Sequence, residues 1–320
     1  MKRTSYPRSV SRSVKVAVLV AIAMTVVIYA ALVKGRTARA TRALRVLPST
    51  ARAVLRIDPA ALRRSTAARA MLDAFIGEAE LSEIEATCGL DPVTDLAEVT
   101  IWVRGSERQP FESFGLMLTG AQVDAAQIAE CYEQLVDARG GSVTRLEAPT
   151  GPFLASDDRS SAIAFVDNRT VITGSVRTVA EAMAAERGLL PTLVERVAVA
   201  SLWPTVSAGA AIAAAVDPPP HWKAALERIT TFGADASALH GVDAIGLTIR
   251  PGRSHAAEIH LDTTTRELAA QSAELIRTLA TVPGDAAEPP WDAVLRSAEV
   301  TVEGRHLTVH VDLASLTPRR

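Results

Sequence analysis

The feature that most constrains this chain is an uninterrupted apolar run at residues 16–33. Its eighteen residues (VAVLVAIAMTVVIYAALV) include no charged side chain, and Lys15 and Lys34 bracket it. As a helix the run would be about 27 Å long, close to the roughly 30 Å of a bilayer's hydrocarbon core. The sequence therefore predicts a transmembrane helix at 16–33, preceded by a basic cytoplasmic tail at 1–15 and followed by a basic linker at 34–48.

Two alternatives to a membrane anchor are a buried core helix and a cleaved signal peptide. The basic flanks argue against a core helix. A basic N-terminus before an apolar run is also typical of a signal peptide, but this run is longer than the usual apolar region of one. The one triplet that resembles a cleavage site, Ala38-Arg39-Ala40, lies several charged residues beyond its end. We expect an uncleaved signal anchor.

The flanking charges do not orient the anchor, because five basic residues precede the run and five follow it. The α-amino group adds a charge to the short tail, and a short basic tail before a long domain is the usual layout of a signal anchor. We therefore expect the body outside the cytoplasm. Thirty Arg against four Lys, with a single Asn at Asn168, indicate a GC-rich bacterium. The expected location is the bacterial inner membrane, with a large C-terminal domain in the periplasm.

The net charge of -2 conceals an acidic body. Residues 46–320 carry 24 Lys and Arg against 36 Asp and Glu, a net charge of -12. Such a surface repels phosphate backbones, so no nucleic acid partner is expected. A composition of 48% apolar and 22% charged residues is that of an ordinary globular protein.

Cys88 and Cys131 are the two cysteines of the chain, and both lie in the body. There is no CxxC pair, which excludes a zinc ribbon or a redox motif of that kind. In an oxidising compartment a disulfide between them would add about 3 to 4 kcal/mol by the loop-entropy argument. The alternative is two small buried apolar side chains. Both interpretations fit the local pattern.

From residue 49 on, the sequence has the pattern of an α+β protein. Strands are predicted over 51–57, 99–104, 114–119, 162–167 and 170–173, and helices over 60–76, 79–87 and 177–187. Asp124 with Gln127 forms a capping box for one more helix, which carries apolar residues on one face.

The second half repeats this order of elements. Strands are predicted over 209–216, 244–250 and 256–262, a helix around Trp222 to Ile229, and a second capping box at Thr264 with Glu267. Asp217-Pro218 echoes Asp58-Pro59. A degenerate internal duplication explains the pattern, and chance similarity of common α+β elements is the alternative. We expect two related α/β-sandwich-like lobes, 49–188 and 189–320, with mainly antiparallel sheets and helices on one face.

The last hairpin, 298–313, predicts its own register. A two-residue loop at Gly304-Arg305 pairs Val302 with Leu307, Val300 with Val309 and Ala298 with Val311. The opposite face then carries Glu303 with His306, Thr301 with Thr308 and Glu299 with His310. The segment 166–171 matches 302–307 position by position, with Asn168 in place of Gly304, so the same turn is expected in both hairpins.

Six histidines lie in the second half, with acidic companions at Glu258, Asp262 and Glu299, which raises the question of a metal site. They are His221, His240, His255, His260, His306 and His310. On a strand, His306 and His310 would be about 13 Å apart, too far to share an ion, and His255 and His260 would face opposite sides. We expect solvent-facing histidines, no metal and no cofactor.

Motifs of known catalytic sites are missing from the sequence. It has no G-x-S-x-G, G-x-G-x-x-G, P-loop or H-E-x-x-H. A catalytic lysine would have to be Lys223, which is expected to reach solvent. The four tryptophans, Trp102, Trp203, Trp222 and Trp291, are expected in the core, although a ligand groove would also use them.

These observations predict a non-catalytic, membrane-anchored envelope protein whose body serves as an interaction or scaffold module for an unknown envelope partner. One alternative is a protein that binds a lipid or another apolar ligand between sheet and helices, for which we expect a large apolar pocket between the lobes. Another is an unrecognised hydrolase, which would need a cleft with convergent Asp, Glu or His side chains.

Overall fold

The structure is a computed structural model. It describes residues 42–64, 78–105, 112–218, 239, 241–251, 256–281 and 296–312. The expected anchor at 16–33 and the expected helix after Pro220 lie outside the described residues, as do His221, Lys223, His240, His255 and Trp291. Among the described helices, none is both long enough and apolar enough to cross a membrane.

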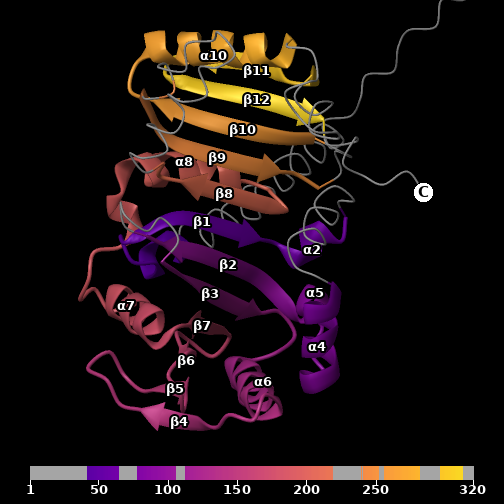
Figure 1. The fold of residues 1–320 in the computed structure, drawn as a ribbon, viewed down its shortest axis with the longest axis vertical. Helices are drawn as coiled ribbons and strands as arrows, with labels where there is room; N and C mark the ends of the chain where they lie inside the picture. The colour runs from indigo at the N-terminus through magenta and orange to yellow at the C-terminus, as the bar shows by residue number, and fades with distance from the viewer. Residues whose placement is uncertain are drawn as a thin grey trace, which may run out of the picture.

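The described strands form one antiparallel sheet of twelve, in the order β11-β12-β10-β9-β8-β1-β2-β3-β7-β6-β5-β4 (Figure 1). Their bounds are β1 Ala51–Ile57, β2 Leu96–Arg104, β3 Ser113–Gly120, β4 Val143–Leu146, β5 Phe153–Ser156, β6 Ala162–Phe165, β7 Thr170–Gly174, β8 Ile212–Val216, β9 Val242–Ile249, β10 Ala256–Thr263, β11 Glu299–Glu303 and β12 His306–Asp312. Together with the helices, this sheet confirms the expected α+β class.

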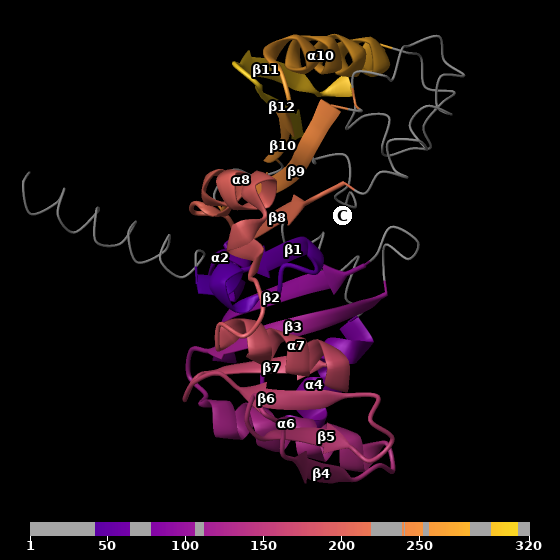
Figure 2. The same ribbon diagram turned by 90° about the vertical axis from the view of Figure 1, so that its left-hand side faces the viewer.

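The described helices pack along this sheet. They are α2 Pro59–Leu62, α4 Glu78–Cys88, α5 Pro92–Asp95, α6 Ala125–Ala138, α7 Val176–Glu186, the 3-10 turn η1 Leu193–Glu195, α8 Val197–Ser207 and α10 Arg266–Thr281. Residues 42–46 form a short helix just before β1. Figure 2 shows α10 beside β11 and β12, at the end of the sheet opposite to β4.

The two halves of the chain share one sheet and do not form separate ones. β1 pairs with β8 in antiparallel fashion at the centre, with Val54 opposite Ala215. Outward from β1 follow β2, β3, β7 and β6, and outward from β8 follow β9, β10, β12 and β11. The expectation of one sheet per lobe was wrong, because the first strand of each half still has a free edge, and the two edges pair.

Helices cover both faces of the sheet, so the prediction of helices on one face was also wrong. We call the face bearing Trp102, Met117 and Ile172 the first face; α7 and α8 pack on it. The second face bears the alternate residues, such as Leu118 and Val171, and α6 packs there. The reason is that these strands are apolar at successive positions, so each face needs a cover.

Two predictions based on local sequence signals are confirmed, the capping box of α6 and the register of the last hairpin. The Asp124 carboxylate accepts from the Gln127 backbone N–H and the Gln127 side chain accepts from the Asp124 N–H, both at 2.9 Å, which confirms the capping box of α6. The β11–β12 pairs from Val302–Leu307 to Glu299–His310 have the predicted register.

Two local predictions were wrong. The hydroxyl that accepts from the first turn of α10 belongs to Thr265, which bonds the Leu268 N–H, because the helix starts one residue later than the Thr264 capping box requires. The β6–β7 turn also differs from the β11–β12 turn. Phe165 pairs with Val171, and the Asp167 carboxylate binds the Arg169 N–H, so this loop is longer than the one with Gly304 at φ +62°.

Candidate functional site

The candidate site is an apolar cavity of about 380 Å³ between the second face of the sheet and helices α4 and α6. Its volume is within the usual range of ligand pockets, roughly 300 to 1,000 Å³. Its lining comes from α4 to β7 and is Ile84, Leu90, Pro92, Asp95, Leu96, Val99, Ile101, Leu116, Leu118, Val123, Ile128, Cys131, Tyr132, Leu135, Ile163 and Thr173. This cavity lies within the first half of the chain and is not the apolar pocket between the lobes that the sequence analysis expected for a ligand-binding protein.

The sheet provides the floor of the cavity because alternate residues of neighbouring strands share a face. Ile101 pairs with Leu116 and Val99 with Leu118, so four apolar side chains from β2 and β3 point to the same side. Thr173 of β7, opposite Leu116, continues this floor. Leu116 and Leu118 are only partly buried, which leaves apolar surface facing the cavity.

Helix α6 provides the roof. Ile128, Cys131, Tyr132 and Leu135 line the cavity at the i, i+3, i+4, i+7 spacing of one helix face. This is the apolar face expected from the sequence. The cavity itself was not predictable, because its other walls come from strands and a helix far away in the chain.

The roof is attached to α4 at two points. Cys88 and Cys131 are joined by a disulfide, and the Arg139 guanidinium donates to both carboxylate oxygens of Glu83 at 3.2 Å. Glu83 precedes Cys88 along α4, whereas Arg139, the partner of Glu83 at the end of α6, follows Cys131, the partner of Cys88. The two helices therefore run antiparallel. Since Cys131 lines the cavity, the disulfide fixes one of its walls.

The polar atoms around the cavity already have partners. The Asp95 carboxylate accepts from the Asp91 N–H at 2.9 Å, the Thr173 hydroxyl donates to the Ala162 carbonyl at 2.9 Å, and the Tyr132 hydroxyl lies 3.0 Å from that of Ser161. These hydrogen bonds to the protein engage the few polar side chains that line the cavity. The arrangement therefore suits an apolar ligand, held by burial of its surface.

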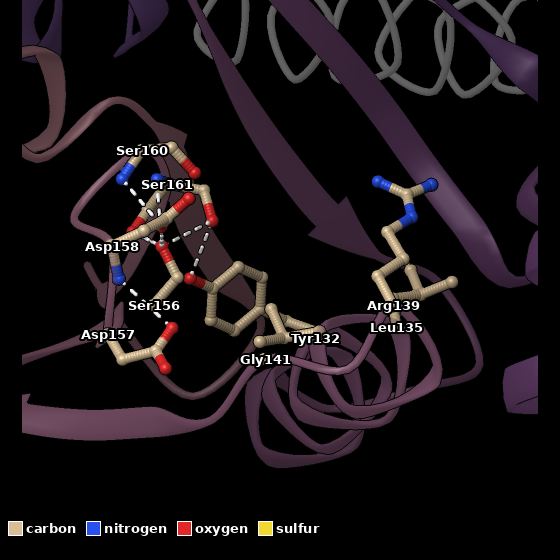
Figure 3. A pocket seen from close by; sticks show the side chains of 10 residues that line it. Tyr132, Leu135, Arg139, Gly141, Ser156, Asp157, Asp158, Ser160 and Ser161 are labelled. Atoms are coloured by element: carbon tan, nitrogen blue, oxygen red, sulfur yellow. Dashed lines mark hydrogen bonds between the residues drawn. The ribbon is translucent and has the colours of Figure 1, made fainter.

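A smaller cavity of about 300 Å³, with several serine and aspartate residues in its lining, shares Tyr132 and Leu135 with the apolar one (Figure 3). Ser156 donates to the Asp158 carboxylate at 2.6 Å, and this hydrogen bond holds the pKa of Asp158 below its usual range. The Ser160 N–H also donates to Asp158, at 2.9 Å. Serine and aspartate here stabilise the β5–β6 turn, in which Arg159 has a φ of +57°.

The described histidines lie on the first face of β10 and β12, in two separate groups. The expectation of solvent-facing histidines was wrong for His260, which is buried in the sheet between Thr248 and Thr308. Glu258 is 3.6 Å from His260 Nε2 and 3.8 Å from His310 Nδ1, and it forms an ion pair with Arg250. Asp262 is 3.3 Å from His306 Nδ1 and 3.3 Å from Arg305 Nε. No set of three or more His, Cys, Asp or Glu among the described residues is placed to hold a metal ion.

Two of the four tryptophans are described, and both are fully buried. Trp102 and Trp203 belong to the core on the first face, away from the apolar cavity. Trp102 lies against Gly115, where a Cβ atom would be 2.2 Å from its ring. These two tryptophans are packing residues, as the sequence suggested.

Comparisons with known proteins find only distant structural similarity. No known family matches the sequence, and no match is found among curated proteins. Solved structures of TP0453 are similar: crystal form III at 13% identity, covering 85% of this chain and 95% of that chain with a TM-score of 0.44, and crystal form I at 12%, 86%, 93% and 0.45. No family and no function follow from these comparisons.

Proposed function

We propose that this protein is a single-pass bacterial envelope protein whose periplasmic body binds the acyl chain of a lipid, or a similar apolar ligand, without catalysis. The observation that carries this proposal is the cavity of about 380 Å³ whose lining is almost entirely apolar. Cavities lined by aliphatic side chains favour apolar ligands over water. The anchor at 16–33 would hold the body next to a source of such ligands.

The shape of the proposed site also supports a binding role. The sheet and α6 are each part of a packed core, and the disulfide joins α4 to α6. A site with walls fixed in this way binds with little loss of conformational entropy. A catalytic role finds no comparable support, because the described lining of the cavity has few polar side chains.

Our proposal includes an origin of the body by duplication. The series β1-β2-β3-β7-β6 and β8-β9-β10-β12-β11 match element by element around the central β1–β8 pair. Only the first half has the additional hairpin β4–β5 within the described residues. On this interpretation the first half acquired the ligand cavity, and the second half completes the sheet.

Photo-crosslinking with a diazirine-bearing fatty acid tests ligand binding in the full chain held in nanodiscs. We expect peptides from β3 and α6 to be labelled. The variant Leu116→Trp fills the cavity and should reduce that labelling at least tenfold. The matched control, Leu247→Trp, places the same ring at a partly buried leucine of the same sheet face in β9 and should leave the labelling unchanged.

Labelling of β3 and α6 that is equal in the two variants would contradict ligand binding in this cavity. The interaction or scaffold module would then be the better function. Both variants are compared only if their thermal unfolding midpoints are close to that of the wild type, because an overpacked core costs about 1 to 3 kcal/mol.

A further inference from the structure

Exposed apolar side chains are concentrated in one short segment that joins the two halves. Leu189 is 62% exposed, Leu190 41%, Val194 41% and Val197 76%. Four of the six large apolar residues that are exposed in the described part of the chain thus fall within nine positions. Single exposed apolar residues are ordinary, but a contiguous group of them marks a contact surface.

This segment is held against the chain that follows the predicted anchor. The Leu193 N–H donates to the Leu47 carbonyl at 2.8 Å, and the Ser49 N–H donates to the Pro191 carbonyl at 2.9 Å. Pro48 and Thr192 form an isolated antiparallel bridge between these bonds. Leu193 points inward and is buried with Leu47, so its neighbours present their side chains to the outside of a fixed turn.

The apolar run at 16–33 ends fourteen residues before Leu47, the residue that is bonded to this turn. Even fully extended, the chain from Val33 to Arg42 spans about 30 Å. The short helix at 42–46 leads directly to Leu47, so the segment 189–197 stays close to the bilayer that would hold the anchor. The length of the chain between the expected anchor and this segment therefore keeps the segment near one apolar partner, the bilayer.

Charged side chains of both signs lie beside this surface, with Glu186 and Glu195 exposed as well as the arginines. Arg42 and Arg45 are exposed on the helix at 42–46, and Arg187 is exposed just before Leu189. Arg42 and Arg196 both form ion pairs within the protein, Arg42 with Asp167 and Arg196 with Asp217, and Arg196 also donates to the Ser49 carbonyl. Apolar side chains next to arginines are the composition of segments that lie in the lipid headgroup region.

We propose that residues 189–197 form a second membrane contact, which inserts Leu189, Leu190, Val194 and Val197 into the interface of the bilayer that holds residues 16–33. The inference is independent of ligand binding in the cavity and rests on the anchor part of the proposed function. The chain that follows the expected anchor is bonded to this contact through Leu47 and Leu193, so two points of attachment would give the body a defined orientation on the membrane.

Site-directed fluorescence tests this contact in the full chain reconstituted into vesicles of phosphatidylethanolamine and phosphatidylglycerol. Cys88 and Cys131 are bonded to each other, so an introduced cysteine is the one free thiol. An NBD group at Val197→Cys should have a blue-shifted emission and be quenched at least twofold by nitroxide-labelled lipid. The control Thr301→Cys, exposed on β11, should show neither effect.

Two further variants separate the outcomes. Ala23→Cys, within the apolar run, reports whether the anchor itself is in the bilayer. Quenching at position 23 without quenching at 197 would overturn the second contact and leave the anchor standing, whereas no quenching at either position would overturn both. In the background of Leu189→Ser and Leu190→Ser, quenching at position 197 should fall, and quenching that is unchanged there would show that the dye alone inserts.

Discussion

His260 shows how a single buried side chain in this sheet depends on pH. Its Nε2 is 3.3 Å from the Thr248 hydroxyl and its Nδ1 is 3.4 Å from that of Thr308. Burial lowers the pKa of His260 from its ordinary value of 6.5, although the nearby Glu258 acts in the opposite direction. Arg250 and His310 also face this group and oppose its protonation.

The sign of the effect on stability follows from this shift. The unfolded chain takes up a proton at His260 near pH 6.5, whereas the folded protein resists it. The contribution of the neutral His260 imidazole to the free energy of unfolding is therefore complete above about pH 6.5. This contribution is lost as the pH falls below that value. At acidic pH the imidazole must charge inside the fold or the fold must open.

We expect His260→Gln to make the urea unfolding midpoint less sensitive to pH between about 7.5 and 5.5, because an amide can bond both threonines and does not titrate in this range. The same substitution at His306, which is exposed on the same face, is the control. A wild-type midpoint that does not fall between these two pH values would contradict the argument.

Helices α4 and α6 are joined by the Cys88–Cys131 disulfide, which is expected to contribute to the stability of the fold. Replacement of both Cys88 and Cys131 by serine should reduce the free energy of unfolding by about 3 to 4 kcal/mol, the loop-entropy value for a separation of 43 residues. Urea unfolding measures this loss. Wild-type protein unfolded in the presence of reductant should lose the same amount, and an unchanged midpoint in the serine variant would contradict the prediction.

The sequence was informative about elements whose signals are local. The capping residues of α6 and the alternation in β11 and β12 act within a few positions, so they predicted the α6 start and the hairpin register. Helix α8 escaped prediction because most of its residues are apolar and it contains Pro204. It also delays the strand predicted from residue 209, which starts at Ile212.

The candidate site was predictable only in part. The inward residues of α6, including Cys131 and Leu135, followed from the helical period. Their partners on the other walls, such as Ile101 and Leu116, are in contact with them only because β2 and β3 pair and the chain returns over the sheet. Long-range pairing of this kind has no signature in a single sequence.

For the molecule as a whole, one labelling experiment reports both on which side of the membrane the body lies and on whether its cysteines are oxidised. In intact cells, a membrane-impermeant maleimide should label Cys88 and Cys131 only after reduction and without disruption of the inner membrane. This result is expected because the proposed periplasmic location keeps disulfides oxidised. Labelling that needs lysis but no reductant would place the body in the cytoplasm and contradict the proposed localisation.

The pairing of β1 with β8 at the centre of the sheet also sets the order of events when the protein is made. β1 leaves the ribosome early, but its second neighbour β8 follows roughly 150 residues later, so one edge of β1 stays unpaired while most of the body is synthesised. An open apolar edge strand is a template for aggregation. On the proposed periplasmic location, the nascent chain would need either a chaperone that covers β1 or a translocation rate that delivers β8 before two unfinished copies meet.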